Sequence, residues 1–173
     1  VLVTGREYTA LLETPCFQRG EMSCLSCHAL HQSTDDDREV KQWANDQLKV
    51  GMEGDLACVQ CHQNFENDRT LTEHTHHATG SSGSKWYTVH MAYTTYGLLN
   101  AIRSHQIDSP TVAASLETGR PNACNQCHLD KTLAWTSQYL SNWYGIESPK
   151  LSEDEQAVAA SVIWVLSGDA TQR

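Results

Sequence analysis

The stretch CLSCH at residues 24–28 decides how this chain folds, because its spacing returns as CVQCH at residues 58–62 and as CNQCH at residues 124–128. In each stretch two cysteines stand three positions apart and a histidine directly follows the second. This is the attachment signature of c-type haem, in which two thiols add to two vinyl groups of one porphyrin edge and the adjacent imidazole ligates the iron. The sequence therefore predicts three covalently bound haems c, attached at Cys24, Cys27, Cys58, Cys61, Cys124 and Cys127 and ligated by His28, His62 and His128.

Other chemistry also uses paired cysteines. Two CxxC pairs have the spacing of zinc knuckles, and six cysteines suit a disulfide framework. A histidine in the same place after all three pairs favours haem, because only roughly one residue in twenty of this chain is a histidine. The seventh cysteine, Cys16, lies outside the pattern. We interpret it as a small buried residue, with a crosslink to another subunit or a contact with the first haem as alternatives.

The composition of the 173 residues limits the kind of fold and partner. Only 39% of the residues are hydrophobic and two are phenylalanine, so side chains alone predict a thin core that flat apolar porphyrins would complete. The formal net charge of −9 argues against nucleic acid and favours redox partners with basic docking faces. No run of about eighteen apolar residues is present, so we expect no membrane span.

The cellular location is indicated by the cysteine chemistry. Thiols are joined to c-type haem outside the cytoplasm, which predicts a periplasmic or extracellular protein. The chain begins at Val1 and shows no charged segment followed by an apolar one, so we expect a processed form or a fragment. The missing signal sequence is therefore no argument for the cytoplasm.

Six further histidines are candidates for second axial ligands, because low-spin haem iron takes a ligand on each face and imidazole is a common choice. His31 lies three positions after His28, so one iron cannot take both on opposite faces and His31 would reach a neighbouring haem. His74 and His77 precede a Gly/Ser loop that allows close approach to a porphyrin, and His76 between them is a weaker candidate. The predicted distal ligands are His31, His74, His77 and His105.

The predicted fold class is mostly α with extensive loops, and its geometry is set by the haems. We expect a single multihaem domain over residues 1–173. Residues 1–108 form its haem- and histidine-rich part, and residues 109–173 form a helical part that carries the third CxxCH. No segment shows a strand pattern of useful length.

Two helices are expected in the first part. Residues 35–51 predict an exposed helix with three aspartates at its start and a glycine at its end. Its inward face would consist of Val40, Trp43, Ala44 and Leu48. A second apolar stripe at helical spacing, made of Leu98, Leu99 and Ile102, leads to His105 and makes that histidine a good distal ligand.

The helical part is punctuated by caps. Ser109 as N-cap and Gly119 as terminator predict one helix, and Gly145 closes another over residues 129–145. Ser152 and Glu155 form a capping box before an apolar helix that extends to about residue 168. That last helix is apolar around much of its circumference, so we expect it to be buried or to lie against another chain or a further domain.

Longer stretches resemble a known family. They are PCFQRGEMSCLSCHALH (residues 15–31), HTHHATGSSGS (74–84), YTTYGLLNAIRSHQIDSP (93–110) and GRPNACNQCHLDKTLAWTSQYLSNWYG (119–145). Together they are similar to a group of bacterial multihaem c-type cytochromes with four haems, whose chains often continue into HEAT-type repeats. The resemblance implies closely spaced bis-histidine haems that pass electrons. It also implies that His31, the His74–His77 cluster and His105 occupy distal-ligand positions.

The fourth attachment site of such proteins is altered here. The segment WYTVH at residues 86–90 has Trp86 and Val89 where the cysteines would stand, and keeps His90. A fourth covalent haem is therefore not expected. Three outcomes are open: packing by Trp86 and Tyr87 fills the site, His90 alone holds a non-covalent haem, or the sequence is assigned wrongly at these positions.

The leading functional hypothesis is an electron carrier without a catalytic residue. An enzyme of the nitrite-reducing or hydroxylamine-oxidising kind, with one haem open on its distal side, is the alternative. A haem-bearing subunit of a larger electron-transfer assembly is a third possibility and is compatible with the first.

Overall fold

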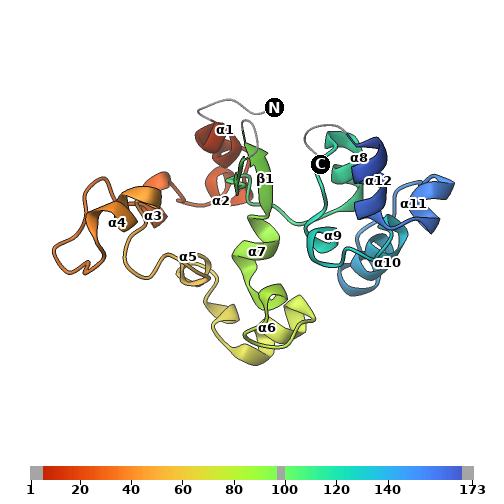
Figure 1. Ribbon diagram of the computed structural model, residues 1–173. Coiled ribbons are helices and arrows are strands. Elements are labelled where there is room, and N and C mark those ends of the chain that lie inside the picture. Colours follow the sequence, from red (N-terminus) through yellow and green to blue (C-terminus); the bar gives the residue numbers. More distant parts are fainter. Residues whose placement is uncertain (1–5, 97–99, 169–173) are drawn as a thin grey trace. The chain divides into compact units, whose positions relative to one another are not determined.

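The structure is a computed structural model that describes residues 6–96 and 100–168, and Figure 1 traces its elements in chain order. The described chain is mostly helical, with long loops and one two-stranded sheet, which confirms the mostly α class, while a haem-organised fold stays a prediction. No helix in these two ranges is long and apolar enough to cross a bilayer. The elements are α1 (Arg6–Leu12), α2 (Pro15–Gln18), α3 (Cys24–Cys27), α4 (Val40–Asp46), α5 (Leu56–Val59), η1 (Gln63–Phe65), α6 (Asp68–Thr75), η2 (Ser82–Ser84), α7 (Trp86–His90), β1 (Tyr93–Tyr96), β2 (Asn100–Arg103), α8 (Val112–Thr118), α9 (Ala123–Cys127), α10 (Leu133–Tyr144), α11 (Glu153–Ala157) and α12 (Ala160–Ser167).

The chain divides into two compact units. The histidine-rich unit comprises Glu7–Met91 and His105–Ile107, and the C-terminal unit comprises Arg6, Ala92–Ser104 and the chain from Asp108 onward. Eight of the nine histidines belong to the first unit and only His128 to the second. The histidine-rich unit holds two CxxCH motifs and the C-terminal unit holds one.

A small apolar core stabilises the C-terminal unit. Val112 of α8, Leu133 of α10, and Ala160 and Trp164 of α12 are buried and pack as one cluster, with Leu151 against it. The helices around this core touch one another: α10 contacts α8, α9 and α11, and α12 contacts α9 and α11. Burial of these apolar side chains by one another stabilises the unit.

Helix ends in this unit follow two of the predicted signals. Gly119 and Gly145 end α8 and α10 in the left-handed conformation, with φ of 69° and 67°. The predicted N-cap Ser109 is wrong, because α8 starts after Thr111, whose hydroxyl accepts a hydrogen bond from Ala114 N at 3.0 Å. A threonine side chain in that position satisfies an N–H at the helix start, which leaves the preceding serine outside the helix.

The last predicted helix is in fact two helices. Ser152 and Glu155 form the expected capping box, but α11 ends at Ala157 and α12 begins at Ala160. The break lets Ala160 N donate to the carbonyl of Lys131 at 3.0 Å, just after the third CxxCH. The expected burial holds for only part of α12. Ala160 and Trp164 are buried, whereas three apolar side chains are exposed: Val162, Val165 and Leu166.

A β-hairpin forms where the sequence indicated a helical stripe. β1 and β2 pair antiparallel, with Thr94 opposite Ile102. Ile102 is half-buried on β2, so the helical stripe is wrong for residues 100–103, whereas Leu98 and Leu99 lie outside the described residues. The Tyr and Thr residues of β1 explain the result, because aromatic and β-branched side chains favour strands and a short apolar run does not separate helix from strand.

The histidine-rich unit buries few apolar side chains. Among its described residues, only Leu11 and Trp86 are both hydrophobic and buried, which agrees with the thin core expected from composition. Polar contacts hold its loops instead. Arg38 donates to both carboxylate oxygens of Asp36, at 2.9 and 2.7 Å, and to the carbonyl of Leu48 at 2.6 Å.

The helix predicted over residues 35–51 is shorter than expected. α4 spans Val40–Asp46 and starts after the three aspartates, because Asp36 pairs with Arg38 instead of lying at the helix N-terminus. Gln47, with φ of 55°, ends the helix before the predicted glycine. Of the four side chains expected to face inward, Trp43 and Leu48 are half-buried, while Val40 and Ala44 are exposed.

Candidate functional site

The three CxxCH motifs share one local structure. α3 and α9 carry both cysteines of their motifs, and α5 carries the first cysteine of the second motif. In each motif the histidine N–H donates to the carbonyl of the first cysteine, at 2.9 Å for His28, 3.0 Å for His62 and 2.8 Å for His128. The i, i+3 spacing puts both thiols on one face of a helical turn with the histidine at its end. Each motif can therefore present two sulfurs and one imidazole to a single group.

One thiol of each pair is open to solvent. Cys24, Cys61 and Cys127 are exposed, and their partners are half-buried. Burial raises the pKa of each half-buried thiol and is the main cause of the shift. The pKa of Cys27 is raised, that of Cys58 is raised to about 12 and that of Cys124 to about 11. These thiols are protonated at neutral pH. None of the seven cysteines, all of which lie in the described ranges, forms a disulfide.

Cys16 lies beside the second motif. It is half-buried on α2, and its charge contributes to the raised pKa of Cys58, after burial, Asp55 and Cys27. Of the roles considered for Cys16, the half-buried position suits a small packing residue. Its neighbour is the second motif, whereas the sequence suggested the first as an alternative.

His28 and His105 form the first imidazole pair. Their ring centroids are 6.2 Å apart and their planes differ by 19°. His28 Nδ1 lies 2.8 Å from the carbonyl oxygen of Asp46, and a β-bridge to Leu48 fixes the backbone. A carbonyl acceptor requires that Nδ1 carry the proton, which leaves His28 Nε2 as the nitrogen able to ligate a metal.

His74 of α6 and His90 of α7 form the second imidazole pair. Their ring centroids are also 6.2 Å apart, with planes 11° apart. Burial, followed by the nearby charge of His90, lowers the pKa of His74, so its ring is neutral at neutral pH. The sequence placed both residues among the candidate ligands, but only the folded chain shows which histidine faces which.

Trp86 lies at the centre of the rings around this second pair. Its ring centroid is 5.5 Å from that of His74, 5.6 Å from that of His90 and 5.3 Å from that of His62. Phe65 of η1 packs on it at 4.5 Å. Trp86 is 9% exposed, and its Nε1 is buried without a hydrogen-bond partner.

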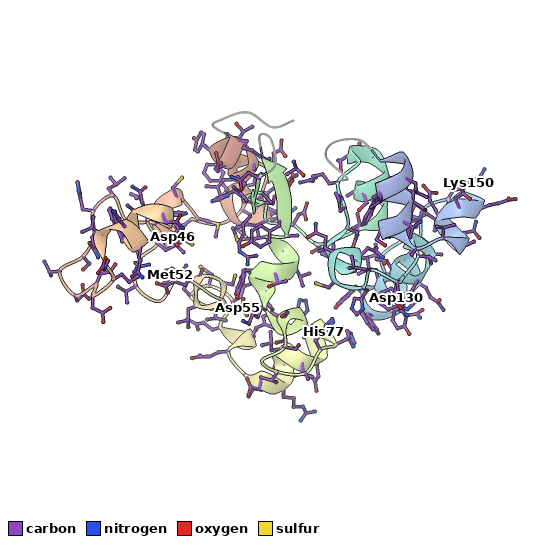
Figure 2. All side chains as sticks on the ribbon, viewed as in Figure 1. Asp46, Met52, Asp55, His77, Asp130 and Lys150 are labelled. Carbon is purple, nitrogen blue, oxygen red and sulfur yellow. The ribbon has the colours of Figure 1, made fainter. Side chains whose placement is uncertain are left out.

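Asp55 positions the start of α7. Its Oδ1 accepts a hydrogen bond from Tyr87 N at 3.2 Å, and Figure 2 labels this aspartate beside the helices that it joins. The carboxylate satisfies an N–H in the first turn of a helix whose last residue is His90. Neither Asp55 nor Phe65 carries a sequence signal that would have indicated these roles.

The remaining candidate histidines have different surroundings. His77, labelled in Figure 2, has its Nδ1 2.6 Å from the carbonyl of Thr75, so its Nε2 is the nitrogen able to ligate. Its ring packs over Gly83, where an added Cβ would lie 2.6 Å from the ring Cγ, so the glycine makes room for His77. His76 ends α6 in the left-handed conformation, with φ of 54°. His31 is exposed in a loop.

Two buried asparagines fix the third motif. Asn125, between the two cysteines, donates from Nδ2 to the carbonyl of Lys131 at 3.1 Å and accepts from the Thr136 hydroxyl at 2.7 Å. Asn122 caps α9 by accepting from Cys124 N at 2.9 Å, while its buried Nδ2 has no hydrogen-bond partner. The motif is therefore held rigidly against α10.

A row of aromatic rings runs along α10 from the histidine of this motif. Ring centroids are separated by 5.0 Å from His128 to Trp135, 4.7 Å from Trp135 to Tyr139 and 4.8 Å from Tyr139 to Trp143. Tyr139 and Trp143 remain 36% and 38% exposed. The row provides a broad apolar surface beside the motif. Sequence analysis missed it, although its spacing of four was visible.

In the part of the chain that the structure describes, no group of three or more His, Cys, Asp or Glu side chains is arranged to hold a metal ion. No protein-family model matches the chain, and no curated protein or solved structure matches it. What bears on function is therefore the chemistry of the three motifs and of the two imidazole pairs.

Proposed function

We propose that this chain is an exported multihaem c-type cytochrome that passes electrons between redox partners through three covalently attached haems. The observation that carries the proposal is the CxxCH turn, formed three times with the same histidine hydrogen bond. Two thiols on one face of a turn with an imidazole at its end match the two vinyl groups and the iron of one haem. The resemblance to four-haem bacterial cytochromes supports the same assignment.

The separation of the His28 and His105 rings suits two axial ligands on one iron. A bond from a metal to an imidazole nitrogen is about 2 Å long and the ring centre lies about 1 Å further, so two trans imidazoles have centres about 6 Å apart. The observed centroid separation is 6.2 Å. The carbonyl of Asp46 at His28 Nδ1 supports the same role, because ligating histidines usually donate their other ring N–H to such an acceptor.

The surroundings of the motifs fit a large flat apolar group. In the C-terminal unit the half-exposed rings of Tyr139 and Trp143 continue the apolar surface that begins beside His128. Aromatic faces of this kind pack favourably on other flat rings. In the histidine-rich unit so few apolar side chains are buried that an added apolar group would supply much of the interior.

In this proposal, each step of haem attachment and ligation is assigned to named residues. The six paired cysteines hold the haems, His28, His62 and His128 ligate the irons, and His105 is the second ligand of the first iron. His31 and His77 remain candidates for the distal faces of the others. Haem supplies one-electron chemistry, and axial ligands set its potential over about 0.8 V, with two histidines towards the low end.

The acidity of the chain indicates how partners bind. The formal net charge is −9, and ionised haem propionates would add to it. We therefore propose redox partners with basic docking faces and an association that weakens as salt rises. Because thioether attachment of haem occurs outside the cytoplasm, the proposal includes a periplasmic or extracellular location.

The axial pairing is tested by replacing His105→Met. A methionine ligand raises the potential of a haem, so one midpoint potential should rise while the other two stay unchanged in a redox titration followed by EPR. His76→Asn is the matched control, because asparagine tolerates the left-handed conformation at that position and should leave all three potentials unchanged. A high-spin iron in the unmodified oxidised protein would instead favour the enzyme with one open haem.

A further inference from the structure

The segment WYTVH at residues 86–90 has the frame of the CxxCH motifs, with Trp86 and Val89 in the two cysteine positions. α7 covers Trp86–His90, so the segment forms the same kind of helical turn and also ends on a histidine. The ring of His74 lies nearly parallel to that of His90 at 6.2 Å. The rings of His28 and His105 have the same separation, and His28 is the histidine of a CxxCH motif.

Trp86 lies beside the two imidazoles, at nearly the same distance from each. Its ring centroid lies 5.5 Å from that of His74 and 5.6 Å from that of His90, so it is nearly equidistant from them. With those imidazoles 6.2 Å apart, the indole centre is closer to the midpoint of the pair than to either ring. A porphyrin with its iron at that midpoint would extend in the plane equidistant from both rings, and the centre of the indole lies close to that plane.

The indole of Trp86 is held in place by packing against other rings. It packs on Phe65 at 4.5 Å and on His62 at 5.3 Å, and it is 9% exposed. Its buried Nε1 has no acceptor, and a buried N–H without a partner is destabilising. Trp86 is therefore a flat apolar filler whose polar atom is not used, which distinguishes it from a residue selected for a hydrogen bond.

We propose that His74 and His90 form a latent bis-imidazole haem site that Trp86 keeps closed. The ligand class is an iron porphyrin bound by two imidazoles. This inference rests on the proposed function, because the His28–His105 pair is the reference for the separation. In the unmodified chain the indole takes the porphyrin position, so this pair holds no haem. Removing the indole opens the site.

The first test adds haemin to the holoprotein of the Trp86→Gly variant. One additional low-spin haem should bind per chain, as measured by absorbance titration, and acid extraction should remove it while covalent haem stays with the protein. Trp86→Phe is the matched control, because phenylalanine keeps a ring in the same space and should prevent uptake. Adding His74→Ala to the glycine variant should abolish uptake.

The second test does not depend on a cavity. Trp86→Cys combined with Val89→Cys restores the attachment spacing, and intact mass should show one more covalent haem than in the unmodified protein. Stoichiometric haemin uptake by the unmodified protein would overturn the inference, as would no added haem in either opened variant. An unmodified protein without any covalent haem would overturn the proposed function instead, so the two failures are distinguishable.

Discussion

The two units of this chain support the same CxxCH turn in different ways. The C-terminal unit has an apolar core built from α8, α10 and α12, and buried asparagines fix its motif. The histidine-rich unit carries two motifs and eight histidines but buries only Leu11 and Trp86 among its described hydrophobic residues. From this difference we expect that the C-terminal unit folds through its own side chains, whereas the histidine-rich unit would depend on the proposed haems.

The largest expected effect comes from removing one pair of attachment cysteines from each unit in turn. Cys58→Ala with Cys61→Ala should unfold the histidine-rich unit, because the proposed haem would no longer complete its thin interior. Cys124→Ala with Cys127→Ala should leave the apolar core of the C-terminal unit folded. Limited proteolysis with mass identification of the fragments would measure both. If both units were equally sensitive to protease in the two variants, the expectation that only the histidine-rich unit needs its haem to fold would be wrong.

The core of the C-terminal unit is tested by Leu133→Ala. Truncation of a buried leucine should lower the free energy of unfolding by about 2–5 kcal/mol, measured by far-UV circular dichroism in denaturant, with the covalent haem count unchanged. Leu129→Ala is the matched control, because that leucine is 57% exposed and should shift stability by less than about 0.5 kcal/mol. A similar loss of unfolding free energy in both variants would mean that this core does not stabilise the C-terminal unit.

The attachment turn itself is tested by Asn125→Ala. The change removes the hydrogen bonds of the Asn125 side chain to the Lys131 carbonyl and the Thr136 hydroxyl, so the free energy of unfolding should fall by about 1–3 kcal/mol. Denaturant titration measures the change. Asn142→Ala on the exposed side of α10 serves as control. No difference between the two variants would argue against a rigidly fixed third motif.

The smallest effect is expected on the surface of the histidine-rich unit. Arg69 and Glu73 form an i, i+4 ion pair at 2.8 Å, with side chains that are 86% and 62% exposed. Arg69→Ala should change the stability of this unit by at most about 0.5 kcal/mol, because water and salt screen such pairs. A larger loss in a thermal melt would show that surface charges, and not cofactors, hold the unit together.

Local signals were predictable from sequence, whereas tertiary pairings were not. Gly119, Gly145 and the Ser152–Glu155 box end or start helices as expected, because caps depend on neighbouring residues. The antiparallel pairing of Tyr93–Tyr96 with Asn100–Arg103 was missed, since a short apolar run fits strand or helix.

The histidines show the same limit at the candidate site. His105 was expected to be a distal ligand, but its position opposite His28 depends on residues far apart in the chain. The burial of Trp86 beside His74 and His90 likewise follows from the packing of α6, η1 and α7, which sequence periodicity does not predict.

The central claim is tested most directly by the intact mass of the denatured protein, produced with export and haem-attachment machinery. We expect the mass of the polypeptide plus three haems, which remain bound through acid extraction. A mass equal to the polypeptide alone would contradict the assignment of the three CxxCH turns. A mass with four covalent haems would contradict the closed site at Trp86.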